Sequence, residues 1–244
     1  MFSILIISVI LSYALMQAIE LTSFGSRVAG RVTKNLALGT TLHQTIYVGS
    51  RVLVVPFLPM LAYLVETGIS LDTYLILVII ALFVTTLISI SILLNLNFFQ
   101  LYFQVVFSKY AKSTIPIALF RSFLGLRKNL KDLKYIEKVS FDLINGKKVL
   151  VSFLAYSFLV TGFFIAFLLA IIYPSYQLTL SQSTAFFHGF GAVIVAFYLD
   201  PMLSRSMDKS KDQAWLINSY SIVFGRVLSY AISCFSFIIL YLIL

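Results

Sequence analysis

Two arginines lie inside long apolar stretches of the sequence, where a charged side chain is costly. Arg51 lies well within the stretch from Ala37 to Val65. Arg226 lies roughly 16 Å beyond Trp215 if that stretch is helical at ~1.5 Å per residue, which is near the midplane of a bilayer. An arginine there costs at least ~2.5–3.5 kcal/mol, so it usually faces a bundle interior or an aqueous cavity. The planar guanidinium matches phosphate oxygens, and we therefore expect an anionic ligand.

Polar and small residues accompany both arginines at helical spacing. His43, Tyr47 and Ser50 recur at three- and four-residue steps, which places them with Arg51 on one side of a helix. The residues beside Arg226 are small and permit close helix packing. They are Ser221, Gly225, Ser229 and Ser233.

Two acidic residues, Glu20 and Asp200, supply an alternative explanation for the arginines. In that interpretation, Arg51 and Arg226 pair with these acids and only fasten helices together. We favour a functional site in which the carboxylates compete with the ligand, because an arginine that binds an anion too tightly would trap it.

The sequence carries no motif of a known catalytic centre. The patterns HExxH, GxSxG and DDxxD and the phosphate-binding P-loop are absent. His43 and His188 lie on different apolar stretches, where a lone histidine is typical of helix packing, although either can titrate and serve proton coupling. The single cysteine, Cys234, excludes an intrachain disulfide. We therefore expect no catalytic residue, no metal site and no cofactor.

The composition indicates a membrane protein. Of the 244 residues, 60% are hydrophobic and 11% are charged, and the mean hydropathy is +1.00. A soluble domain carries about 25% charged residues, so this chain cannot cover a globular surface with solvated side chains. Soluble enzymes, nucleic-acid-binding proteins and secreted disulfide scaffolds are excluded, despite the net charge of +9.

Six apolar runs place the arginines on membrane-spanning helices, since each is near or above the ~20 residues that a bilayer core requires. The expected spans are Phe2 to Phe24, Ala37 to Val65, Leu71 to Phe99, Val149 to Tyr173, Thr184 to Leu203 and Ala214 to Leu244. The expected fold is an all-α, polytopic membrane helix bundle that forms a single integral membrane domain over residues 1–244.

The positions of the other basic residues set the orientation. All of them fall in three segments that six alternating spans place on one side. These are the loop with Arg27, Arg31 and Lys34, the segment 109–148, and the loop with Arg205, Lys209 and Lys211. The opposite loops contain no lysine or arginine, so we place the basic segments in the cytoplasm and both termini outside.

Leucines and basic residues alternate at helical spacing within segment 109–148, between spans three and four. Leu126, Leu130 and Leu133 share one side, and Arg127 and Lys131 lie toward the other. We expect this basic amphipathic segment to lie on the inner leaflet against anionic lipids.

Proline residues predict irregularities in two of the spans. Pro56 and Pro59 remove helical N–H groups and predict a bend toward the outer end of the second span. Pro201, directly after Asp200, predicts that the fifth helix ends there.

Short motifs near both ends of the chain resemble one family. The motifs are Ile19-Glu20, Ser26-Arg27-Val28-Ala29-Gly30-Arg31, Ser50-Arg51, Leu199-Asp200-Pro201, Asp208 and Gly225-Arg226. They resemble the Amj family of bacterial lipid II flippases, named as the alternate to MurJ. The resemblance implies a multi-pass protein of the bacterial inner membrane. It would move an undecaprenyl-diphosphate-linked saccharide, lipid II, from the cytoplasmic to the outer leaflet.

The resemblance and the buried arginines together define an expected site. The substrate-binding residues are Arg51, Arg226, Arg27 and Arg31, and the coupling or gating residues are Glu20, Asp200, His43 and His188. The first two arginines would hold the diphosphate, while the other two, with the acids, would form the cytoplasmic entrance.

Two other classes stay open from the sequence. One is an integral-membrane enzyme acting on a lipid phosphate, which would need clustered acidic and histidine ligands. The other is a non-transporting membrane subunit whose charges only pair helices. Six spans make a small transporter, which allows a homodimer, and no nucleic-acid partner is expected.

The orientation predicts which introduced cysteines are accessible from outside intact cells. Cysteines that replace Glu66 or Ser181 should react with an impermeant thiol reagent, and a cysteine that replaces Lys134 should not. Labelling of the Lys134→Cys variant without permeabilisation would contradict the orientation.

Overall fold

The protein is described by a computed structural model over residues 2–110, 113–125, 144–209 and 214–244, and every regular element in those ranges is helical. Six of its helices are long and apolar enough to cross a membrane. They span Phe2–Val32, Leu36–Glu66, Leu71–Leu94, Gly146–Ile172, Pro174–Asp208 and Ala214–Ile243. The all-α prediction with six candidate spans is confirmed, while three of the spans have boundaries that differ from expectation.

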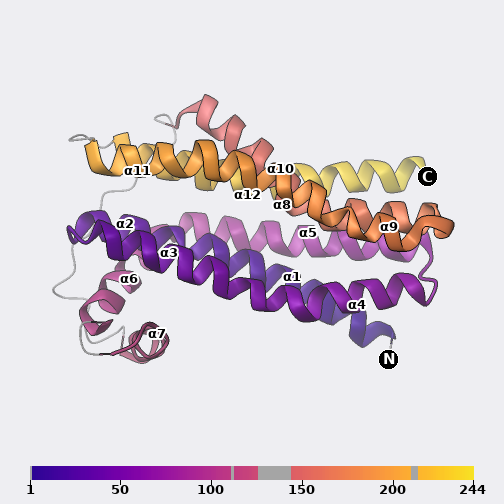
Figure 1. The fold of residues 1–244 in the computed structure, drawn as a ribbon, viewed down its shortest axis with the longest axis horizontal. Helices are drawn as coiled ribbons and strands as arrows, with labels where there is room; N and C mark the ends of the chain where they lie inside the picture. Colours follow the sequence, from indigo (N-terminus) through magenta and orange to yellow (C-terminus); the bar gives the residue numbers. More distant parts are fainter. Residues whose placement is uncertain (1, 111–112, 126–143, 210–213) are drawn as a thin grey trace.

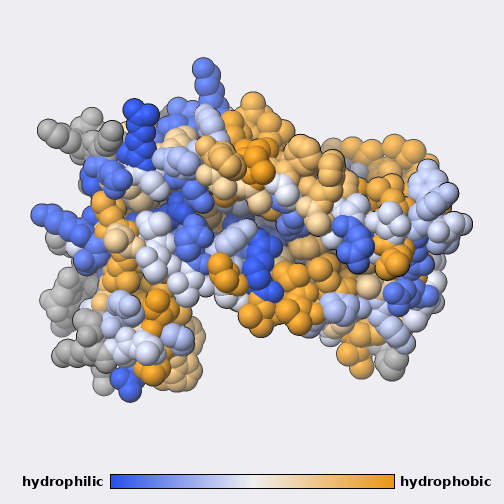
Figure 2. Space-filling model, viewed as in Figure 1, coloured by the Kyte–Doolittle hydropathy of each residue, from blue (hydrophilic) through white to orange (hydrophobic). Residues whose placement is uncertain are grey.

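The long helices lie along one elongated bundle, with both termini at the same end (Figure 1). The opposite end carries α2 (Phe24–Val32), α6 (Leu96–Tyr110), α7 (Ile115–Gly125) and α11 (Asp200–Lys209). We call this the basic end. Figure 2 shows apolar side chains along much of the bundle, with hydrophilic side chains at its ends and in the middle of the face shown. Such an apolar flank is the surface that a bilayer requires.

The first span is longer than expected, and its helix is interrupted at Ser23. Only Ser23 separates helix α1 (Phe2–Thr22) from α2, and its hydroxyl donates to the Glu20 carbonyl at 2.6 Å. The span therefore continues to Val32, and the expectation that it ends at Phe24 is wrong.

Arg27 and Arg31 consequently lie on helix α2, and their expected placement in a loop is wrong. The turn comes later, at Lys34, whose φ of 61° is in the left-handed region. The Asn35 N–H donates to the Gly30 carbonyl at 2.7 Å, which closes the helix in the usual way for a left-handed cap.

The second span changes its helical pitch directly before its prolines. Helix α3 (Leu36–Ser50) passes into a 3-10 turn, Arg51–Leu53, and then into α4 (Val54–Glu66), which contains Pro59. The span stays continuous from Leu36 to Glu66, because the tighter turn accommodates the missing proline donors within the helix.

The third span ends earlier than expected. Helix α5 (Leu71–Leu94) stops at Asn95, whose side-chain amide donates to the Ser91 carbonyl at 2.8 Å. Helix α6 then turns away from the bundle axis, and α7 packs on it (Figure 1). Phe99 therefore belongs to α6, and the expected end of the span at Phe99 is wrong. The amphipathic part of the predicted basic segment, 126–143, lies outside the described residues.

The fifth span runs from Pro174 to Asp208 instead of the expected Thr184 to Leu203, and the expectation that its helix ends at Asp200–Pro201 is wrong. Helices α9 (Gln177–Gln182) and α10 (Thr184–Ile194) lead into a π-helical turn, Val195–Leu199, and then into α11. Pro201 cannot donate to the carbonyl four residues before it. The wider π turn precedes it directly, and Pro201 occupies the first turn of α11, where a missing N–H is tolerated.

The core lies toward the end of the bundle that holds the termini. It joins α1, α4, α5, α8 (Gly146–Ile172) and α12 (Ala214–Ile243). The Tyr13 hydroxyl donates to the Val160 carbonyl at 3.0 Å, and the Tyr74 hydroxyl donates to the Phe164 carbonyl at 2.7 Å. These bonds link helices that the sequence places far apart.

Close packing of α8 on α12 generates a stability prediction at Gly225. A Cβ atom there would lie 2.5 Å from the Val149 carbonyl oxygen and 2.7 Å from Ser152 Cβ. The Gly225→Ala variant should therefore lose about 1–3 kcal/mol of stability, measured by thermal unfolding in detergent.

The matched control for this variant is Gly49→Ala. A Cβ atom at Gly49 meets nothing within 4 Å, so alanine should be neutral or stabilise by up to ~1 kcal/mol through helix propensity. Equal stability of both variants would mean that α8 and α12 do not approach as closely as described.

Candidate functional site

A buried ion pair joins two spans at the basic end. The Arg27 side chain on α2 is 3% exposed, and one of its terminal nitrogens lies 2.7 Å from Asp200 Oδ1 on α11. The Arg27 Nε is also buried, and it has no hydrogen-bond partner among the residues that the structure describes. The structure thus brings together two of the expected site residues, although they are far apart in the sequence.

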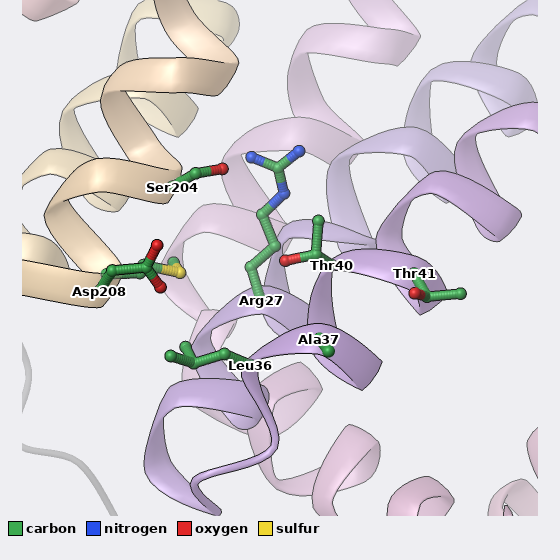
Figure 3. Close-up of a pocket in the computed structure, with 8 residues that line it drawn as sticks. Arg27, Leu36, Ala37, Thr40, Thr41, Ser204 and Asp208 are labelled. Atoms are coloured by element: carbon green, nitrogen blue, oxygen red, sulfur yellow. The ribbon is translucent and has the colours of Figure 1, made fainter.

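A cavity of about 500 Å³ lies beside this ion pair (Figure 3). Its walls come from α2, α3 and α11, and Arg27 is one of its lining residues. The other lining residues are Leu36, Ala37, Thr40, Thr41, Ser204, Met207 and Asp208.

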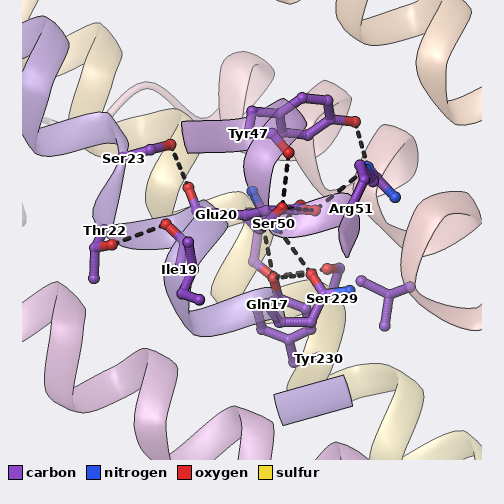
Figure 4. Close-up of polar contacts among 12 residues, drawn as sticks. Gln17, Ile19, Glu20, Thr22, Ser23, Tyr47, Ser50, Arg51, Ser229 and Tyr230 are labelled. Carbon is purple, nitrogen blue, oxygen red and sulfur yellow. Dashed lines mark hydrogen bonds and ion pairs between the residues drawn. The ribbon is translucent and has the colours of Figure 1, made fainter. Parts of the chain in front are cut away.

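Glu20 occupies the centre of a second polar cluster, deeper in the bundle (Figure 4). Its side chain is 4% exposed, and Oε2 lies 2.6 Å from the Arg226 guanidinium. Its other oxygen, Oε1, accepts from the Ser50 hydroxyl at 3.0 Å and lies 3.4 Å from the Arg51 guanidinium. One carboxylate on α1 therefore connects the second span to the sixth.

The Arg226 guanidinium is enclosed on every side. It donates from Nε to the Tyr230 hydroxyl at 2.6 Å and from a terminal nitrogen to Gln17 Oε1 at 2.8 Å. Its central carbon lies 4.5 Å from the centre of the Tyr156 ring, a cation–π contact. Arg226 is only 1% exposed, so in this conformation protein groups satisfy its charge.

Arg51 differs from Arg226 in being accessible. Its side chain is 30% exposed, it donates to the Tyr47 hydroxyl, and it lies 4.6 Å from the centre of the Tyr47 ring. Among the described residues, the ion pairs of Arg51 and Arg226 both end on Glu20. Two guanidinium groups therefore share one carboxylate, and the cluster carries one uncompensated positive charge.

The remaining expected residues lie outside this cluster. His43 Nδ1 lies 2.8 Å from the Ser23 hydroxyl oxygen, at the break between α1 and α2. Because that hydroxyl donates its proton to the Glu20 carbonyl, Nδ1–H is the donor to it. The centres of the His188 and Phe163 rings lie 4.0 Å apart. The Nε2 of His188 is buried and has no hydrogen-bond partner in the described part of the chain. The Arg31 guanidinium lies 6.0 Å from the centre of the Trp215 ring, at the beginning of α12. Each histidine therefore contacts a neighbouring helix rather than Glu20 or Asp200.

Three residues of the central cluster were not among the sequence candidates. Gln17 precedes Glu20 by one helical turn, and Tyr230 follows Arg226 by one turn, so helical spacing could have identified both. Tyr156 reaches Arg226 from α8, and no local spacing signals that contact.

Comparison with known proteins identifies the family. A family model described as Amj, alternate to MurJ, matches residues 13–229, which include every charged residue of both ion-pair clusters. No curated protein and no solved structure matches the chain. The members of this family are bacterial membrane flippases that provide an alternative to MurJ for lipid II in peptidoglycan synthesis, and they are transporters rather than enzymes. Because the family match covers most of the chain, this protein belongs to the Amj family.

Proposed function

We propose that the cluster of Glu20, Arg51 and Arg226 binds the diphosphate of lipid II during its passage across the bilayer. The observation that carries this proposal is the sharing of one carboxylate by two guanidinium groups. The uncompensated charge in the bundle costs free energy unless an anion approaches it. A lipid diphosphate is such an anion, and its oxygens suit the fork of donors on an arginine.

Arg51 is the first arginine to contact the diphosphate in this mechanism. Its 3.4 Å separation from Glu20 is longer than the 2.6 Å separation of Arg226 from the same residue, so it is the weaker contact. Val52 and Val55 beside it are exposed on the apolar flank of the bundle. An isoprenoid tail can therefore stay in the bilayer while its diphosphate reaches Arg51.

Arg226 serves first as a positioning residue for Glu20. Its Nε and one terminal nitrogen donate to Tyr230, Gln17 and Glu20, and its side chain is only 2% exposed, so we expect it to reach the diphosphate only when that network rearranges. Glu20 competes with the diphosphate for both arginines. This competition keeps the substrate from being trapped and returns the cluster to its starting state after release.

The basic end faces the cytoplasm in this proposal, and both termini face outside. The distribution of lysine and arginine supports that orientation. Arg27 and Asp200 then hold α2 and α11 together where the substrate enters, with Arg31 beside them at the start of α12. His188, with its unpartnered Nε2, and His43 are the candidates for proton coupling. Binding of anionic lipids to segment 109–148 and formation of a homodimer stay predictions.

Replacement of Arg51 by lysine tests the direct contact with the diphosphate. The Arg51→Lys variant keeps its charge but loses the bidentate donors, so transport should fall about 10-fold or more, as for loss of one or two charge-assisted hydrogen bonds. Growth of a host depleted of its own lipid II flippases measures transport. The control is Arg205→Lys on the exposed surface of α11, which should leave growth unchanged. If both variants support normal growth at matched protein levels, recognition by Arg51 is excluded.

Replacement of Glu20 by glutamine tests the competition. The Glu20→Gln variant removes the carboxylate charge that both arginines share. Binding of undecaprenyl diphosphate to the protein in nanodiscs should become tighter by about 10-fold, the effect of ~1.4 kcal/mol. Transport should become slower, because the Glu20 carboxylate no longer helps to release the diphosphate from the arginines. An unchanged or weaker affinity would refute the competing role of Glu20.

A further inference from the structure

We infer that the cavity between α2, α3 and α11 binds the uncharged saccharide portion of the lipid II headgroup while the diphosphate lies near Arg51. This inference rests on the proposed function of the central cluster. It assigns the two parts of one headgroup to two places in the bundle, on grounds of charge, hydrogen bonding, size and position.

The charge of the cavity does not favour a diphosphate. Arg27 is its one basic lining residue, and Asp200 already compensates that charge at 2.7 Å. Asp208 adds a carboxylate at the exposed side, and no ion pair joins it to another residue in the described part of the chain. The two charged lining residues, Arg27 and Asp208, therefore sum to no net charge, and the one guanidinium is already paired with Asp200, so the cavity offers a phosphate no uncompensated cation. Its carboxylate and hydroxyl groups can still accept hydroxyl and amide hydrogens.

Hydrogen-bonding groups converge on the space around Arg27. The side chains of Thr40 from α3 and of Ser204 and Asp208 from α11 point toward this space from two sides (Figure 3). A ring with several hydroxyl and acetamido groups can donate to Asp208 and exchange hydrogen bonds with the hydroxyls of Thr40 and Ser204.

The size and walls of the cavity also suit a sugar. Its volume of about 500 Å³ lies within the ~300–1,000 Å³ of typical ligand sites. Leu36, Ala37 and Met207 provide an apolar wall against which the non-polar face of a pyranose ring can pack. The lining thus combines a few directional polar groups with apolar surface, as small-molecule sites commonly do.

The position of the cavity matches the geometry of the substrate. Arg27 follows Glu20 by roughly 10 Å along the helices at ~1.5 Å per residue. A saccharide linked to a diphosphate can extend over that distance from the central cluster to the cavity. The cavity also lies beside the Arg27–Asp200 ion pair, so a headgroup there would contact both α2 and α11.

Two lipid probes separate saccharide recognition from anion recognition. Binding of lipid II and of undecaprenyl diphosphate, which has neither saccharide nor peptide, is measured on the full-length protein in nanodiscs, and a peptide-free saccharide-linked undecaprenyl diphosphate should respond to the cavity variants as lipid II does. The Thr40→Val and Asp208→Asn variants should each raise the Kd for lipid II about 5- to 10-fold, as for one lost hydrogen bond of ordinary strength. The Kd for undecaprenyl diphosphate should stay unchanged in both variants.

The control is Thr45→Val, the same substitution five residues further along α3. Thr45 is exposed and does not line the cavity. It should leave both Kd values and the thermal stability unchanged. If Thr40→Val and Asp208→Asn change both Kd values equally, or change neither, the saccharide site is refuted.

Failure of the proposed function gives a different result. In that case Arg51→Lys would leave the Kd for undecaprenyl diphosphate unchanged, whatever the cavity variants do. The saccharide inference alone fails when Arg51→Lys weakens the binding of both lipids and the cavity variants do not discriminate between them.

Discussion

The buried ion pair between Glu20 and Arg226 is the interaction on which the rest of the structure depends. Removing both charges from water is expensive, and only good geometry with further hydrogen bonds offsets that cost. Gln17, Tyr230 and Tyr156 supply those contacts around Arg226. Because these residues come from α1, α8 and α12, the ion pair requires three helices to meet at one place, and the tight approach of α8 to α12 follows from the same requirement.

Two ion pairs connect the early part of the chain to the late part. Glu20 on the first span contacts Arg226 on the sixth, and Arg27 at the end of the first span contacts Asp200 on the fifth. Glu20 also contacts Arg51, and so binds the second span into the same network. A flippase must keep such charges satisfied while its helices move. In the mechanism that we propose, a substrate phosphate replaces the carboxylate of Glu20, so that no arginine is left without a counter-charge in the membrane.

Membership of the Amj family decides between the alternatives that the residues left open. It identifies a lipid II flippase and so excludes an integral-membrane enzyme and a subunit that takes no part in transport. The polar residues then divide by environment. Arg226 is enclosed and pairs with Glu20, whereas Arg51 is accessible and an open cavity lies beside Arg27; we propose these two places for the headgroup.

The sequence by itself determined the six spans, the presence of Arg51 and Arg226 within them, and the family. Apolar runs of bilayer length and short motifs are local features, and local features need no knowledge of neighbours. Only the tertiary structure decided that Glu20 is shared by two arginines, that Asp200 belongs to Arg27, and that Tyr156 covers Arg226. Lipid-facing and buried positions are equally apolar, so hydropathy cannot tell which helices touch. A pair separated by 206 residues, such as Glu20 and Arg226, is set by that packing alone.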